Sequence, residues 1–263
     1  MPRFTFDAGH GSFKDALRKV YSTSGKRTPE GIPEWEYNNK VVKAIIAYLS
    51  QYEDVLILRV DDPTGKTDVP LSERVRKINA FKSDAHCSVH HNALKGVWFA
   101  TAGGIETLVR PGTKHYDKSL KIAKLVHPKY VKAMGLRDRG IKQRTDLMMI
   151  SNALNCPSIL TEGGFMDSRI DRKAMDNDAM LKAQGEAIAQ GYVEYFKLKK
   201  KESVKMEVID LTDGQMNAVK KLAKHGMLTE NFVFPNNHLG QSLLTFTTMM
   251  APLIDKLEKN GSL

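Results

Sequence analysis

The sequence predicts an α/β protein with a mixed, largely parallel central sheet flanked by helices, followed by a small helical C-terminal domain. Over residues 1–197, short apolar runs rich in Val, Ile and Leu alternate with longer stretches whose apolar residues recur at helical spacing. Strands separated by helices favour parallel pairing, because a parallel connection needs a crossover long enough to hold a helix. A basic linker at residues 198–206 then precedes residues 207–263, in which we find only helical patterns.

The expected strands are short apolar runs, and they cover residues 3–6, 54–60, 85–90, 104–110 and 158–161. The expected helices of the first domain cover residues 34–52, 71–81, 115–134 and 180–196. Pro128 falls inside the third of these helices and predicts a kink or a break there. In the C-terminal domain we expect helices at residues 213–226 and 239–257, with Pro252 interrupting the second.

The composition of this 263-residue chain limits its partners and its compartment. The net charge of +10 attracts polyanions, and residues 206–263 are slightly acidic, so the basic surface belongs to the first domain. The chain lacks helix-turn-helix and zinc-finger spacings, so we expect no nucleic-acid partner. No apolar stretch is long enough for a bilayer, so we expect no membrane insertion. The N-terminus resembles a first strand and not a secretory leader, which predicts synthesis in the cytoplasm without a signal peptide.

The chain has two cysteines, Cys87 and Cys156, and each lies inside an apolar run. We expect no disulfide between them, as is usual for a protein made in a reducing compartment. Cys87 precedes His90 by three residues, so a thiolate metal ligand is an alternative to simple packing. A strand points residues 87 and 90 to opposite faces, which favours packing for Cys87.

Two histidines and an acid follow apolar runs at three distant places in the chain. His10 lies between two glycines after the first expected strand, and His90 ends the strand at residues 85–90. Glu162 follows the strand at residues 158–161. Sites in open α/β sheets gather at the carboxyl ends of strands, so we expect these side chains to meet. Imidazole and carboxylate groups are the ligands of a catalytic zinc ion, and the sequence therefore predicts a zinc hydrolase.

The remaining zinc ligand is expected near the start of the helix at residues 34–52. Glu34 follows Pro33 at the front of this helix, and Glu36 qualifies by location as the alternative. Glu34 also fits a purely structural role, because an acid in the first turn complements the helix dipole. The two histidines favour the ligand role, since Glu34 would complete their site.

Glu162 is the candidate catalytic residue of the predicted site. A carboxylate at the end of a buried strand is costly unless it is paired, so its presence there needs an explanation. One explanation is a structural ion pair. The other is a general base that takes a proton from the attacking water and later protonates the leaving amine.

The sequence resembles the zinc-dependent N-acetylmuramoyl-L-alanine amidases of the third amidase family over about residues 3–197. The motifs that carry this resemblance are DAGHG at 7–11, EWEYN at 34–38, SVHHNA at 88–93 and TEGGF at 161–165. Two weaker matches, LSER at 71–74 and RGIK at 139–142, resemble the family's Leu-x-x-Arg and Arg-Gly-Val-Lys. All of these motifs occur in the family's order and at suitable intervals.

The resemblance implies that His10, Glu34 and His90 are the zinc ligands and that Glu162 is the catalytic glutamate. The chain departs from the family pattern at Ala8, where a proline is usual, and at His91, in the variable position after the ligand histidine. Strand alternation would turn His91 away from the face that His90 presents. At residues 167–168 an Asp-Ser pair replaces a small residue and Asn, so the family's loop contacts are not carried over there.

The function implied by the resemblance is hydrolysis of the amide between N-acetylmuramic acid and the L-alanine of the stem peptide in peptidoglycan, with Zn²⁺ as cofactor. The implied setting is the cell wall of a Gram-positive bacterium, reached by a phage endolysin through a holin or by a sporulation enzyme on mother-cell lysis. A zinc peptidase acting on wall peptides and a non-catalytic wall-binding protein are the alternatives. For the C-terminal domain, which faintly resembles wall-anchoring modules of the S-layer type, we expect binding to wall polymer, docking on the first domain or oligomerisation.

Overall fold

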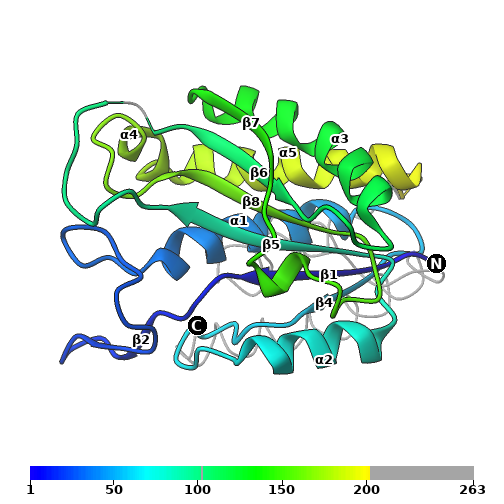
Figure 1. The fold of residues 1–263 in the computed structure, drawn as a ribbon, viewed down its shortest axis with the longest axis horizontal. Helices are drawn as coiled ribbons and strands as arrows, with labels where there is room; N and C mark the ends of the chain where they lie inside the picture. The colour runs from blue at the N-terminus through cyan, green and yellow to red at the C-terminus, as the bar shows by residue number, and fades with distance from the viewer. Residues whose placement is uncertain (102, 202–263) are drawn as a thin grey trace, which may run out of the picture. The chain divides into compact units, whose positions relative to one another are not determined.

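The computed structural model describes residues 1–101 and 103–201 of the chain. Its main sheet has six strands in the order β4-β1-β5-β8-β6-β7 (Figure 1). Neighbouring strands in this sheet are parallel except for β6 and β8, which are antiparallel. The predicted mixed, largely parallel sheet is therefore confirmed. The predicted C-terminal helices and the end of the predicted linker lie outside the described residues.

The strands of the main sheet are β1 (Arg3–Ala8), β4 (Leu56–Arg59), β5 (Ala85–Asn92), β6 (Ile105–Val109), β7 (Asp138–Gln143) and β8 (Ser158–Phe165). A small antiparallel pair is formed by β2 (Phe13–Asp15) and β3 (Val20–Tyr21). The α-helices are α1 (Glu34–Leu49), α2 (Leu71–Phe81), α3 (Tyr116–Met134), α4 (Arg172–Met175) and α5 (Asp178–Phe196). A short 3₁₀ helix, η1, covers Met148–Ile150.

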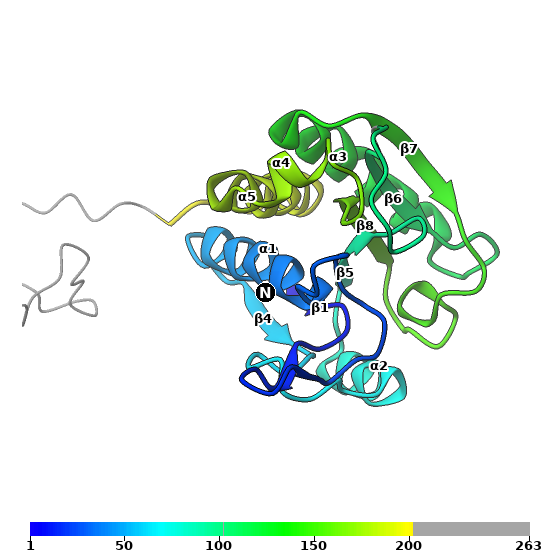
Figure 2. The same ribbon diagram turned by 90° about the vertical axis from the view of Figure 1, so that its left-hand side faces the viewer.

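Alternation along β1 separates the two faces of the sheet. Phe4 and Phe6 point to one face, where each ring centroid lies 5.4 Å from that of Tyr192 in α5. Asp7 points to the other face and meets Arg74 of α2. Helices α1, α3 and α5 thus cover the apolar face, while α2 lies on the opposite one (Figure 2).

Two glycines allow α5 to pack closely against its neighbouring helices. A Cβ at Gly185 would lie 2.5 Å from the carbonyl oxygen of Val41 in α1. A Cβ at Gly191 would collide with Val126 in α3. The close approach at Gly185 holds α1 against α5, and α1 carries one of the predicted site residues at its start.

The structure corrects several of the expected boundaries. Helix α3 continues through Pro128, so the predicted break is absent there. Strand β5 extends to Asn92, so His90 lies inside the strand and not at its end. Strand β8 extends to Phe165, so Glu162 lies inside the strand and not after it. Strand β7 and the β2–β3 pair were not expected at all.

Two residues of the predicted linker pair with the loop that directly follows α1. Lys200 forms an antiparallel bridge with Tyr52, and the backbone N–H of Lys201 donates to the carbonyl of Gln51 at 2.8 Å.

Both cysteines are buried free thiols, which confirms that they form no disulfide. Among the described residues, none of the helices has the length and apolar character needed to cross a membrane.

Candidate metal centre

His10 lies in the loop after β1 and has a left-handed backbone with φ of 66°. Its neighbour Gly9 leaves room for the second histidine, because a Cβ there would collide with the imidazole of His90. The two rings are nearly perpendicular, with an interplanar angle of 87° and centroids 4.9 Å apart. The DAGHG sequence therefore brings two imidazoles together through its glycine and its turn.

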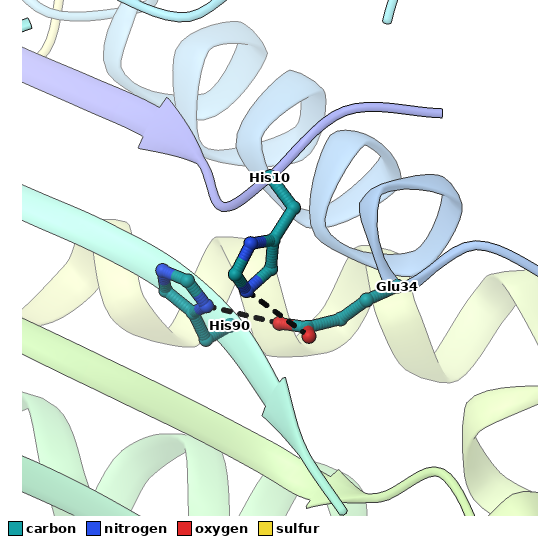
Figure 3. A group of neighbouring side chains, drawn as sticks. All are labelled: His10, Glu34 and His90. Atoms are coloured by element: carbon teal, nitrogen blue, oxygen red, sulfur yellow. Dashed lines mark hydrogen bonds and ion pairs between the residues drawn. The ribbon is translucent and has the colours of Figure 1, made fainter. Parts of the chain in front are cut away.

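Glu34 is the first residue of α1, and only 3% of it is exposed. Its Oε1 lies 2.9 Å from Nδ1 of His90, and its Oε2 lies 3.3 Å from Nε2 of His10 (Figure 3). The same Oε1 accepts hydrogen bonds from the backbone N–H of His91 at 3.1 Å and from the side chain of Asn38 at 3.2 Å. The carboxylate is thus held between both histidines.

The three side chains are a suitable donor set for a metal ion. One ligand atom from each of His10, Glu34 and His90 lies within 4.8 Å of the others. Burial lowers the pKa of His10 to about 4, so its imidazole is neutral at pH 7. Burial alone would raise the pKa of Glu34, but the neighbouring histidines outweigh it and lower that pKa to about 2. Neutral imidazole and ionised carboxylate are the forms that bind zinc.

The alternative ligands raised by the sequence lie elsewhere. Glu36 accepts a hydrogen bond from the hydroxyl of Ser12 and is not part of the His–Glu–His cluster. Cys87 is fully buried in β5 on the face opposite His90. His91 is turned away from His90, as alternation predicts, and its Nδ1 lies 2.7 Å from Oδ1 of Asn38.

Glu162 lies in β8 directly beside the cluster. It is the register partner of His90 on β5 and of Glu106 on β6. Its Oε2 is buried and has no hydrogen-bond partner among the described residues, where it also forms no ion pair. Burial raises the pKa of Glu162 to about 8, with a further increase from Glu34 and Glu106 and an opposing effect of His90. A structural ion pair therefore does not explain this carboxyl group within the described part of the chain.

Arg74 of α2 contacts the backbone of the loop that carries His10. Sequence analysis identified Arg74 only as part of the weak LSER match at 71–74. The side chain is fully buried in α2 and forms an ion pair with Asp7 at the end of β1. Its guanidinium also donates to the carbonyls of Ala8 at 2.9 Å and His10 at 3.0 Å, and to Asp68 at 3.1 Å. Arg74 thereby fixes the backbone that presents His10.

Glu106 was missed by sequence analysis, and it organises a second polar cluster beside Glu162. Its Oε2 accepts from Lys142 at 2.6 Å and from Arg139 at 2.8 Å, both on β7. Its Oε1 accepts from Asn92 at 3.1 Å. A charged residue inside the otherwise apolar run of β6 was the available signal.

A cavity of about 320 Å³ opens beside the histidines. Its walls are mostly apolar and come from the loop before α2, from η1 and from β8. The lining residues are His10, Asp68, Val69, Pro70, Leu71, Arg74, His90, Leu147, Met148, Met149 and Leu160. The candidate metal centre therefore lies at the wall of a pocket of a size typical for ligand sites.

The fold and the cluster define an α/β protein with a candidate His–Glu–His metal centre, formed near the carboxyl ends of β1 and β5 and at the start of α1. The model of the family described as N-acetylmuramoyl-L-alanine amidase matches residues 5–194. The chain belongs to this family, and the resemblance inferred from the motifs is confirmed.

Curated relatives include the endolysin of Bacillus phage SPP1, which is 35% identical over 199 residues, covering 74% of this chain and 66% of the relative. The sporulation-specific N-acetylmuramoyl-L-alanine amidase of Bacillus subtilis is 26% identical over 208 residues, covering 77% of this chain and 71% of the relative. The chain spans 66%, 35% and 55% of the lengths of three of its curated relatives, so it corresponds to only part of those proteins.

Solved structures share the fold. The N-acetylmuramoyl-L-alanine amidase from Clostridium difficile 630 is 25% identical with a TM-score of 0.63, over 74% of this chain and 97% of that chain. The catalytic domain of CwlV from Bacillus (Paenibacillus) polymyxa is 23% identical with a TM-score of 0.63, over 76% of this chain and 100% of that chain.

Proposed function

We propose that this chain is a zinc-dependent hydrolase that cleaves the amide between N-acetylmuramic acid and the L-alanine of the stem peptide in peptidoglycan. The observation that carries this proposal is the partly exposed His10–Glu34–His90 cluster, with Glu162 in the register position beside His90 and its Oε2 unpaired among the described residues. Family membership and the names of the relatives support the choice of bond.

In the proposed site, His10, Glu34 and His90 hold Zn²⁺, which supplies Lewis acidity for the scissile carbonyl and acidifies water when it is bound. Glu162 accepts a proton from the attacking water and donates it to the nitrogen of the departing L-alanine. Because Oε2 of Glu162 has no protein partner among the described residues, it is available for this proton.

Neighbouring groups keep the proposed ligands in place. Asn38 and the backbone N–H of His91 orient the carboxylate of Glu34 by hydrogen bonds. Such contacts hold a carboxylate ready for metal, so that binding requires little rearrangement.

The proposed substrate is the peptidoglycan of a Gram-positive wall, and a phage endolysin is the proposed biological role. The endolysin of a Bacillus phage among the relatives supports this role. The chain would then be made in the cytoplasm and reach the wall after release, through a holin or on lysis of a mother cell. Residues 207–263 are proposed to form a separate domain that binds wall polymer or oligomerises.

Mass spectrometry of fragments released from purified Gram-positive sacculi tests the reaction. We expect stem peptides with a new L-alanine amino terminus from the intact protein, none after zinc removal, and recovery when zinc is restored. Glu162→Gln should release none, whereas Glu186→Gln on the surface of α5 serves as the matched control and should match the intact protein. Cuts within the peptide would instead identify a peptidase, and binding without any release would identify a wall-binding protein.

A further inference from the structure

Four neighbouring strands place a metal-ligand histidine, two acids and a pair of cations in one row. His90 on β5, Glu162 on β8 and Glu106 on β6 are successive register partners, so their side chains project from the same face of the sheet. Beyond Glu106, Arg139 and Lys142 reach back from β7 to the carboxylate of Glu106. Figure 1 shows these strands side by side in the order β5, β8, β6 and β7.

The positive charges of Arg139 and Lys142 are only partly neutralised by the protein. One carboxylate, that of Glu106, faces two cations, which leaves one positive charge in excess. The side chain of Lys142 is 42% exposed, whereas that of Glu106 is only 7% exposed. Within the described residues the Lys142 ammonium donates only to Glu106, although it carries three donors. Donors of Lys142 are therefore available to an anionic group of a ligand.

The order of the row matches the order of groups in the proposed substrate. The scissile carbonyl belongs at the metal site, and the leaving nitrogen belongs at Glu162, which protonates it. The departing peptide must then extend from Glu162 away from the metal, toward β6 and β7. The glycan would lie on the opposite side, toward His10 and the pocket beside α2.

The spacing between the strands also matches the length of the stem peptide. Directly facing residues on neighbouring antiparallel strands have Cβ atoms about 5 Å apart, which places Glu106 one strand beyond Glu162. The ammonium of Lys142 reaches back from β7 to within 2.6 Å of the Glu106 carboxylate. In a stem peptide the second residue is a D-glutamate linked through its γ-carboxyl, so its α-carboxyl remains as a free acid or a carboxamide. Two residues of extended chain reach about 7 Å, which is enough to bring this group from Glu162 to the cations.

We propose that Lys142, assisted by Arg139, binds the α-carboxylate of the second stem-peptide residue and makes the protein selective for D-isoglutamate over D-isoglutamine. Lys142 is then a specificity-determining residue, because its ammonium forms a charge-assisted hydrogen bond with a carboxylate but loses the charge attraction with a carboxamide. This inference rests on the proposed amidase function.

The test compares two soluble muropeptides with the same glycan that differ only in D-isoglutamate against D-isoglutamine. We expect the zinc-loaded full chain to cleave the acid with a kcat/KM about tenfold higher than the amide. Lys142→Met should abolish most of this preference through a higher KM for the acid, and Lys142→Arg should retain it. Lys129→Met is the matched control, because Lys129 forms a similar ion pair with Glu194 at 2.7 Å on the opposite face of the sheet.

Equal cleavage of both substrates by the intact protein would overturn the assignment. An unchanged preference in Lys142→Met would overturn it as well. Cleavage of neither substrate at the muramoyl amide would instead overturn the proposed function, and this outcome is distinguishable because it does not depend on the second residue.

Discussion

The guanidinium of Arg74 donates a hydrogen bond of 3.0 Å to the backbone carbonyl of His10. His10 has a φ of 66°, a left-handed conformation that costs a residue with a side chain roughly 1–2 kcal/mol. Arg74 also binds Asp7 and the carbonyl of Ala8, so a single side chain holds the whole turn that presents this imidazole. The left-handed turn is therefore maintained by a buried contact from α2.

Replacing Arg74 is expected to weaken both the fold and zinc binding. Arg74→Met should destabilise the metal-free protein by about 3–5 kcal/mol, because the carboxylate of Asp7 is left buried and unpaired. Arg74→Lys keeps the charge but cannot reach Asp7 and the carbonyls of Ala8 and His10 together, and it should lower zinc affinity about 10–100-fold. Urea unfolding in EDTA and competition with a chromophoric chelator measure the two effects.

The matched control for this experiment is Arg76→Met in the same helix. Arg76 is 68% exposed and pairs with Glu73 at the surface, so its loss should leave the stability nearly unchanged. Zinc affinity of Arg74→Lys equal to that of the unmodified protein would contradict a positioning role for Arg74.

Glu34 and Glu36, two residues apart in α1, are expected to differ sharply in their importance for zinc. Glu34→Gln should weaken zinc binding more than about 100-fold, because it removes the anionic ligand placed between the two histidines. Glu36→Gln changes only the contact with Ser12 and should leave zinc binding nearly unchanged. Isothermal titration of zinc into both variants decides between them, and the opposite ranking would show that the metal lies elsewhere.

The sequence was sufficient to predict which residues meet at the candidate site, because the two histidines and Glu162 adjoin apolar runs that are easily recognised. His10 and His90 follow or end such runs, and the carboxyl ends of parallel strands meet at one edge. The choice between Glu34 and Glu36 needed the structure, since both lie in the first turn of α1 and only the rotation of the helix separates them.

The parts of the fold that were missed lack a hydrophobic signal. Strand β7 (Asp138–Gln143) is a polar, partly exposed edge strand, recognisable only through its pairing with β6. Glu106 is buried in β6 because two cations from β7 compensate its charge, and that compensation cannot be inferred before β7 is placed.

Asp167 is expected to stabilise the loop after β5 without contributing to zinc binding. Its carboxylate accepts hydrogen bonds of 2.8–3.0 Å from the backbone N–H groups of Leu94, Lys95 and Gly96. Asp167→Ala leaves these donors unpaired and should cost about 1–3 kcal/mol. Faster hydrogen exchange at residues 94–96 with unchanged zinc affinity would support this role. Asp146→Ala, which removes an exposed pair with Arg144, is the control and should alter neither quantity.

Glu162→Gln is expected to change how the stability of the zinc-free protein depends on pH. Because folding raises the pKa of Glu162 from 4.5 to about 8, the folded state retains a proton that the unfolded state loses above pH 4.5. The free energy of unfolding must therefore contain a contribution that falls as pH rises from about 4.5 to about 8 and then levels off. Gln cannot ionise, so the variant should lack this contribution.

The comparison is made by urea unfolding in EDTA at pH 5 and at pH 9, for the unmodified protein and for Glu162→Gln. Subtracting the two proteins at each pH cancels the groups that do not interact with Glu162 and leaves the linked ionisation of Glu162 and His90. The variant should therefore gain stability at pH 9, relative to the unmodified protein, compared with pH 5. Glu186→Gln, at a 37% exposed position on α5, should show no such gain. A difference between Glu162→Gln and the unmodified protein that is the same at both pH values would mean that this carboxyl group ionises normally in the zinc-free protein, and that burial does not raise its pKa.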